Sequence, residues 1–294
     1  MNPTIIELNQ KEPGFREFIG SWLIRGRETM LVDVGPSYSI DQLIRSLTEL
    51  GVDRVDRVLL THIHIDHAGG LAPFLERFPM ARAICHEKGI SHLVDPSRLW
   101  AGTRKTLGND LADGYGPIRP VKEEWLVPHT RVTQKELEIV ETPGHAAHHL
   151  CFIVDGFLFL GEAGGVHFKV GDSEYLRPAT PPVFFMKEFL ESIDRLLSHE
   201  AMPVCYSHFG LAENSHAMLS REKNQLILWE RIIKGEISKG ENGLRERCLD
   251  ALLRRDPELT AFQGLSADGQ EKERFFMRHS IEGYLGYLSL PPAA

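Results

Sequence analysis

Cysteine is scarce in this chain, which has four among its 294 residues. The four stand apart in apolar stretches, and no two of them have the CxxC spacing that is typical of zinc ribbons and redox motifs. Isolated cysteines of this kind usually behave as small buried hydrophobic residues with free thiols. The sequence therefore argues against a disulfide-stabilised secreted domain and favours a reducing compartment. These residues are Cys85, Cys151, Cys205 and Cys248.

Long apolar runs and dense clusters of basic residues are also missing. No segment approaches the length of about 20 apolar residues that a membrane-spanning helix needs. The N-terminal residues MNPTIIELNQKEPGF lack the basic start and the apolar run of a secretion signal. The formal net charge is −8, which disfavours a protein that mainly wraps nucleic-acid backbone. We therefore expect a cytoplasmic protein that has a small-molecule substrate and binds neither nucleic acid nor a membrane.

The chain is instead rich in histidine at one place, the motif THIHIDHAGG. The run RVDRVLL before it is typical of a buried strand, and residues just past a strand end still alternate in direction. His62 and His64 should therefore point the same way. Asp66 and His67 follow where the chain enters a helix, which lets them face a second position nearby. Neutral imidazoles and a carboxylate suit zinc, iron or manganese, so the motif predicts a site for two metals.

Two metals need more ligands than this motif supplies, since zinc usually has about three protein ligands besides water. Three later residues each lie just past a predicted strand: His145 in a Pro-Gly turn, Glu162 after a glycine, and His208 after a short strand. Taken alone, each would be an ordinary surface or capping residue. Ligand-type residues at four separate strand ends together indicate a single site.

These motifs resemble the signature of a known family. THIHIDHAGG is similar to the metal motif of the metallo-β-lactamase superfamily, and TPGH, GE and SHFG resemble its later motifs in the expected order, over about residues 15–210. The resemblance implies an α/β fold, a four-layered αβ/βα sandwich with metals at one edge of two facing sheets. We place the catalytic domain at residues 1–210. Residues 211–294 have helical periodicity and should form an extension that acts as a lid, a homodimer surface or both.

The resemblance also implies how the ligands divide. His62, His64 and His145 would hold one metal, and Asp66, His67 and His208 the other. Glu162 stands where most hydrolytic members have a bridging aspartate. Its extra methylene group leaves three possibilities open: it bridges, it binds one metal, or it swings away. We expect two divalent metal ions, zinc first, with iron or manganese as alternatives and with single occupancy left open.

The expected activity is that of a metal-dependent hydrolase in which a metal-bound hydroxide attacks an ester, thioester, lactone or phosphodiester. Asp66 would orient that hydroxide and carry a proton to the leaving group. Glyoxalase II-like thioesterases share the ligand set and a helical C-terminal region. Two alternatives stay open. One is a mononuclear iron dioxygenase of the persulfide-oxidising type, and the other is a metal-binding interaction protein with little turnover.

Other expectations concern the surroundings of this site. Asp33 ends an early strand and should either support a ligand or form a turn, and of His148 and His149 one should support a ligand and the other face solvent. Residues 87–128 could be a lid over the metals or plain surface helices. The segment after Glu162 is predicted as a connecting loop. The remaining pattern predicts strands at 16–24, 28–34, 54–60 and 81–86 and helices at 39–50 and 70–78.

Overall fold

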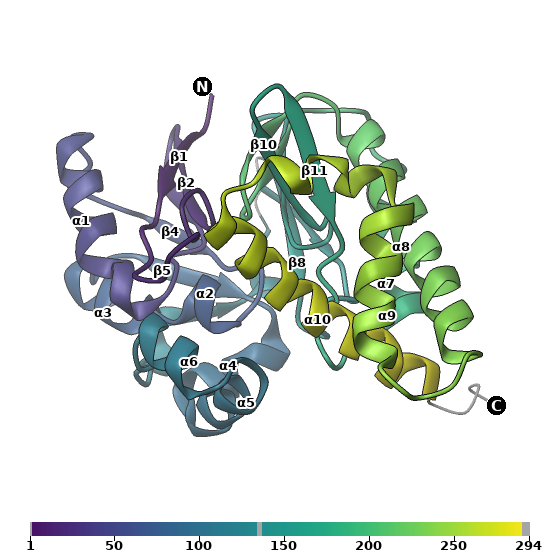
Figure 1. The fold of residues 1–294 in the computed structure, drawn as a ribbon. Helices are drawn as coiled ribbons and strands as arrows, with labels where there is room; N and C mark the ends of the chain where they lie inside the picture. The colour runs from purple at the N-terminus through teal and green to yellow at the C-terminus, as the bar shows by residue number, and fades with distance from the viewer. Residues whose placement is uncertain (1, 134–136, 290–294) are drawn as a thin grey trace.

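The computed structural model describes residues 2–133 and 137–289. Within these ranges two large mixed sheets face each other, and a separate hairpin stands beside the second (Figure 1). The first sheet has the order β1-β2-β3-β4-β5-β6, with β1 Thr4–Glu7, β2 Gly20–Arg25, β3 Thr29–Val32, β4 Arg57–Leu59, β5 Arg82–Cys85 and β6 Leu126–Pro128. The second has the order β13-β12-β9-β8-β7, with β7 Leu137–Glu141, β8 Leu150–Val154, β9 Phe157–Gly161, β12 Val204–Tyr206 and β13 Gly210–Ala212.

Helices cover the outer faces of both sheets (Figure 1). Those of the first half are α1 Ile40–Glu49, α2 Ile65–Ala68, α3 Leu71–Arg77, α4 Glu87–Val94, α5 Ser97–Leu107 and α6 Asn109–Tyr115. Those of the second half are α7 Met186–Leu197, α8 Ser215–Ile237, α9 Leu244–Arg255 and α10 Ala267–Ser289. None of the described helices is both long and apolar enough to cross a lipid bilayer.

Side-chain alternation along the strands produces the layers. In β2, Trp22 and Ile24 pack between the sheets, while Leu23 packs toward the helices on the outer face. This period of two is what an extended strand with both faces buried requires. Helix α1 is amphipathic and buries Leu43 and Leu47 against the outer face of the first sheet. The expected four-layered α/β sandwich is confirmed.

The segment after Glu162 corrects one prediction, because it is a hairpin and not a connecting loop. Strand β10 (Val166–Val170) pairs antiparallel with β11 (Ser173–Arg177), and the register joins Val170 to Ser173 across two turn residues. Gly171 begins that turn with φ +60°, a conformation that favours glycine. The Gly-Asp pair between two alternating runs was the signal in the sequence.

The C-terminal helices are part of the second half's core. Side chains from α8, α9 and α10, among them Trp229, Leu252 and Ile281, share one apolar cluster with the outer face of the second sheet. In Figure 1, α10 (yellow) runs across the front of the molecule between its two halves. The boundary predicted at residue 210 therefore separates elements that pack together. All four cysteines are buried free thiols, as predicted.

A buried carboxyl lies where the C-terminal helices meet the loop after β9. Glu222 of α8 is 0% exposed, and neither of its oxygens has a hydrogen-bond partner among the described residues. It fits there because Gly165 has no side chain, since a Cβ at that position would lie 2.5 Å from Glu222 Oε2. Burial raises the pKa of Glu222 well above its usual value. The folded protein therefore holds a neutral carboxyl.

We predict that Glu222→Gln stabilises the protein increasingly as pH rises. In the unfolded chain Glu222 ionises above pH of about 4.3, whereas the folded protein keeps it neutral until its raised pKa is reached. The wild-type chain therefore loses stability over that interval, and the glutamine variant does not. Denaturant unfolding at pH 4 and pH 8 measures the difference. Glu213→Gln on the surface is the control, and an equal effect at both pH values would contradict the prediction.

Candidate metal centre

The structure brings the seven predicted ligand residues together at one edge of the two sheets. His62 follows β4, His145 follows β7, and Glu162 and His208 follow β9 and β12. The remaining three lie at the start of α2 or just before it. They form two groups in which all ligand atoms lie within 4.8 Å of one another: His62, His64, His145 and Glu162; and Asp66, His67 and His208.

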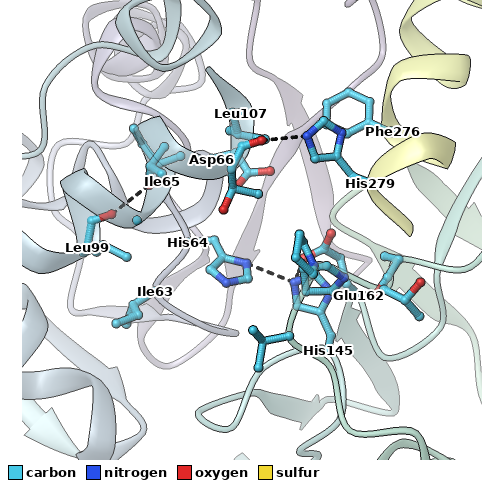
Figure 2. Close-up of a pocket in the computed structure, with 18 of the residues that line it drawn as sticks. Ile63, His64, Ile65, Asp66, Leu99, Leu107, His145, Glu162, Phe276 and His279 are labelled. Carbon is cyan, nitrogen blue, oxygen red and sulfur yellow. Dashed lines mark hydrogen bonds and ion pairs between the residues drawn. The ribbon is translucent and has the colours of Figure 1, made fainter. Parts of the chain in front are cut away.

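In the first group, imidazole nitrogens converge on a common point. His64 Nδ1 lies 2.9 Å from His62 Nε2 and 3.0 Å from His145 Nε2. Nitrogen ligands of a tetrahedral zinc ion are about 3.3 Å apart, given Zn–N bonds of about 2.0 Å. Figure 2 shows His64 and His145 directed toward each other from opposite sides of the site. The nitrogens are thus placed to share one ion.

The carboxylate of Glu162 lies between the two groups. Its Oε2 is 2.9 Å from His145 Nε2, 3.1 Å from His62 Nε2 and 3.4 Å from His67 Nε2. That oxygen is buried, and it has no hydrogen-bond partner in the described part of the chain. An unpartnered buried carboxylate oxygen among imidazole nitrogens fits a metal ligand. Of the three possibilities for the longer side chain, the structure does not show the one in which it swings away.

The second group is slightly wider. His208 Nε2 lies 3.2 Å from His67 Nε2 and 3.4 Å from Asp66 Oδ2. The distance from His67 Nε2 to Asp66 Oδ2 is 3.7 Å. Two imidazoles and one carboxylate are three ligands, which suits a divalent metal that keeps an open position.

For three of the histidines, hydrogen bonds on the far side of the ring fix which nitrogen faces the centre. His145 Nδ1 donates to Ala179 O at 2.8 Å, and His208 Nδ1 donates to Phe18 O at 2.6 Å. His67 Nδ1 donates to the carboxylate of Asp33 at 2.8 Å. With the proton held on Nδ1, each Nε2 presents a lone pair to the site, as metal-binding histidines do.

Sequence comparison agrees with this geometry. The profile described as "Metallo-beta-lactamase superfamily" matches residues 16–208. The chain belongs to this superfamily. Members of the superfamily are mostly hydrolases, and the histidine and carboxylate groups described above suit divalent metal ions.

Individual relatives extend the comparison beyond the matched profile. A metallo-beta-lactamase fold-containing protein, ST1585 from Sulfurisphaera tokodaii, is 30% identical over 238 residues, covering 74% of this chain and 87% of its own. A hydroxyacylglutathione hydrolase from Aeromonas salmonicida is 29% identical over 239 residues, covering 79% and 74%. The crystal structure of TTHA1429 from Thermus thermophilus superposes with a TM-score of 0.64 at 21% identity, covering 97% of this chain and 92% of that one. This last likeness shows the fold.

The charge of each ligand-type side chain in this site depends on its burial and on the neighbouring charged groups. Burial, with the other histidines, lowers the pKa of His62 well below its usual value, and that of His64 to about 3. Burial alone would raise the pKa of Glu162, but His145 and the other imidazoles hold it well below its usual value. The neutral imidazoles of His62 and His64 beside an ionised Glu162 are in the protonation states that bind metals, whereas Glu162 raises the pKa of His145 against the effect of burial.

His67 has the opposite electrostatic environment. Burial alone would lower its pKa, but the carboxylates of Asp66 and Asp33 raise it well above the usual value. The same two carboxylates favour any positive charge placed at this point, whether it is a proton or a metal ion.

Of the two roles left open for Asp33, the structure shows the support of a ligand. Its carboxylate supports a ligand, since it accepts a hydrogen bond from His67, and its backbone has a φ of 58°. It accepts hydrogen bonds from the backbone N–H of Thr61 at 2.8 Å and from the hydroxyl groups of Thr61 and Ser207 at 2.8 and 3.0 Å. With His67, these donors fill a carboxylate that is 0% exposed.

Of the two adjacent histidines after the TPGH turn, His149 supports a ligand, as was predicted for one of them. His149 is buried, donates from Nδ1 to Thr142 Oγ1 at 2.8 Å, and accepts the backbone N–H of Glu162 at Nε2 at 3.2 Å. It thereby fixes the backbone that carries a ligand. His148 does not face open solvent, because it is half-buried and lines a cavity beside His64.

A cavity of about 570 Å³ opens over the ligand residues. In Figure 2, Ile63 and Leu99 lie on one side of the ligands, and Phe276 and His279 of α10 lie on the other. Helix α5 belongs to the insertion at 87–128, so this segment does face the site, as one of the two expectations had it. His279 joins the two walls, since its Nε2 lies 2.7 Å from Thr106 O.

One further histidine pair, which sequence reasoning missed, lies outside this site. His86 and His129 follow β5 and β6, and their Nε2 atoms lie 3.7 and 2.9 Å from the carboxylate of Glu141. His86 Nδ1 accepts the backbone N–H of Lys88 at 3.1 Å, which keeps its proton on Nε2. That tautomer directs an N–H and no lone pair toward Glu141. The hydrogen bond between His129 and Glu141 therefore links the edges of the two sheets.

We predict that Asp33→Asn weakens metal binding about 10- to 100-fold while the fold is retained. The amide has one acceptor oxygen and no negative charge, whereas both oxygens of Asp33 accept hydrogen bonds, one of them from His67. Metal retained after dialysis against graded chelator, measured by elemental analysis, tests this. Asp172→Asn, in the exposed turn of the β10–β11 hairpin, is the matched control. Equal retention in both variants would show that Asp33 does not support the site.

Proposed function

We propose that this protein is a dinuclear metal-dependent hydrolase of acyl substrates, thioesters first and esters second. The observation that carries the proposal is the convergence of seven metal-ligating side chains beneath a largely apolar cavity. The position of Glu162 supports two metals, because its Oε2 lies within 3.4 Å of ligand nitrogens from both groups. Zinc is the first choice and iron or manganese the alternatives, since this donor set discriminates weakly among them.

Bound divalent ions would supply Lewis acidity and lower the pKa of water. The side chains of the protein would position the substrate and transfer protons. Asp66 has the most exposed side chain among the carboxylates of the site, at 19% against 10% for Glu162. Its carboxylate faces the cavity, where it can accept the proton of the attacking water and pass it to the leaving thiolate or alkoxide.

The walls of the cavity favour acyl substrates over phosphodiesters. Its lining includes Ile63, Ile65, Leu99, Val166 and Phe276, which can bury an acyl chain and exclude bulk water. The relative from Aeromonas salmonicida is named as a hydroxyacylglutathione hydrolase, which is a thioester-cleaving activity. This name supports the reaction type for the present chain and leaves its thiol carrier open.

Metal analysis together with a substrate panel tests the proposal. We expect two metal ions per chain in the wild-type protein and a fall toward one in His208→Ala, because that variant removes one of three ligands of the second group. Thioester hydrolysis should be lost on chelation and restored by zinc, manganese or iron(II). His216→Ala is the matched control, because its Nε2 contacts the carbonyl of His199 outside the site.

The alternatives give different results in the same experiment. A single iron that His208→Ala leaves in place, with oxygen uptake on a persulfide substrate, would replace the hydrolase by a dioxygenase. Metal-loaded protein that is inert toward thioesters, esters and phosphodiesters would instead favour a binding function.

For Asp66 we predict that replacement by Asn lowers kcat about 10²- to 10⁴-fold, because the amide can still offer an oxygen to a metal but cannot take a proton. Metal content measured on the same sample separates the two roles of this residue. If kcat falls only in proportion to lost metal, Asp66 is a ligand and nothing more. Asp110→Asn on the surface of α6 serves as the control.

A further inference from the structure

Arg177, the last residue of β11, places a buried guanidinium group in the wall of the cavity. The residue is 3% exposed. Its Nε donates to Glu273 Oε2 at 2.5 Å, and its Nη1 donates to Pro178 O at 3.4 Å. No hydrogen bond joins its Nη2 to a residue in the described ranges. A guanidinium group with a free donor edge therefore borders the space above the metal ligands.

The charges around Arg177 do not balance. Lys272 Nζ lies 3.3 Å from Glu273 Oε1, so two cations share one carboxylate. All three residues are buried, with exposures of 8% for Lys272 and 0% for Glu273. Of the other carboxyls near Arg177, Glu162 belongs to the ligand groups, and burial raises the pKa of Glu222 and keeps that group neutral. A buried cluster with one excess positive charge is stabilised by an anion that can reach it.

Aromatic contacts place this cluster on the same wall as the second ligand group. The Arg177 guanidinium stacks over the Phe276 ring at 5.4 Å, and Phe276 stacks on Phe18 at 5.3 Å. Phe18 in turn packs against the ring of His208 at 4.8 Å. Figure 2 shows Phe276 on the α10 side of the cavity. An anion at Arg177 would thus lie on the same wall of the cavity as His208.

The carboxylates of the cavity lie among imidazole nitrogens in the ligand groups. Among the lining residues that the structure describes, the carboxylates are Asp66 and Glu162, and both belong to the ligand groups. The other cations of the lining, Lys88 and Arg98, are exposed residues at the opposite wall. Arg177 is therefore the buried cation that an acyl chain would meet on the α10 side.

We propose that Arg177 binds a carboxylate on the acyl part of the substrate, so that the preferred substrates are thioesters or esters of dicarboxylic acids. This inference rests on the proposed function and names the substrate class of the same site. The planar edge formed by Nη1 and Nη2 suits the two oxygens of a carboxylate. Phe18 and Phe276 would contact the methylene groups between the two ends of the acyl chain.

Binding of two matched acids to the metal-loaded protein tests the inference without turnover. Glutarate and glutaramate each have one carboxylate for the metals, and only glutarate has a second one for Arg177. Calorimetry should show glutarate binding at least about tenfold more tightly, as one charge-assisted hydrogen bond implies. Equal affinity of the wild-type protein for the two acids would overturn the inference.

Three variants assign the effect to Arg177. The principal variant is Arg177→Gln, because it removes the excess charge and leaves Lys272 paired with Glu273. It should bind the two acids equally, with thermal unfolding showing that it is folded. E273Q alone frees the guanidinium and should keep or strengthen the preference for glutarate. Arg98→Gln should keep the preference, and its loss there instead would place the subsite at the opposite wall.

Hydrolysis then separates this inference from the proposed function. Wild-type protein should cleave a glutaryl thioester at least about tenfold faster in kcat/KM than the butyryl thioester of the same thiol. If both are cleaved equally, the hydrolase stands and the Arg177 subsite is wrong. If neither is cleaved but glutarate still binds preferentially through Arg177, the subsite stands and the proposed function is wrong.

Discussion

The buried carboxylate of Asp33 is the constraint on which the metal centre depends. It accepts hydrogen bonds from Thr61 after β4, from His67 on α2 and from Ser207 after β12, and thus connects the ends of strands from both sheets. Four donors on one carboxylate, fully removed from water, stabilise it in one position and leave no room for an alternative packing. The spacing of the two ligand groups follows from this one anchor, because His67 belongs to one group and the THIH segment to the other.

Contacts between residues far apart in the sequence explain why a glutamate side chain fits between the two ligand groups. His149, held by Thr142, accepts the backbone N–H of Glu162, and the bare Cα of Gly161 lets that imidazole approach. A Cβ at Gly161 would lie 2.6 Å from His149 Nε2. The backbone of Glu162 is therefore fixed by contacts behind it, and its longer side chain spans the remaining distance to His145 and His67.

The sequence was sufficient to predict the fold class and the seven candidate ligand residues that the structure brings together, because short local patterns carry both. Strand alternation and the dense THIHIDHAGG motif put histidines just past strand ends, and the edges of two facing sheets then bring those ends together. The sequence could not show which acceptor holds the rings of His208 and His145, since Phe18 O and Ala179 O are backbone groups far away along the chain. It also concealed the role of Arg177, whose partner Glu273 lies 96 residues later.

The C-terminal helices contribute side chains to the wall of the cavity and none to the candidate metal ligands. Helix α10 supplies Phe276 to the wall and Glu273 and Lys272 to the charged cluster behind it, whereas every metal ligand comes from residues 62–208. Substitutions on α10 can therefore change the shape and charge of the acyl-binding wall without disturbing the ligands, provided that α10 stays packed. That packing depends on the apolar cluster it shares with the second sheet and on the contact of His279 with Thr106 O. A variant that loosens α10 should for this reason lose discrimination among acyl groups before it loses bound metal.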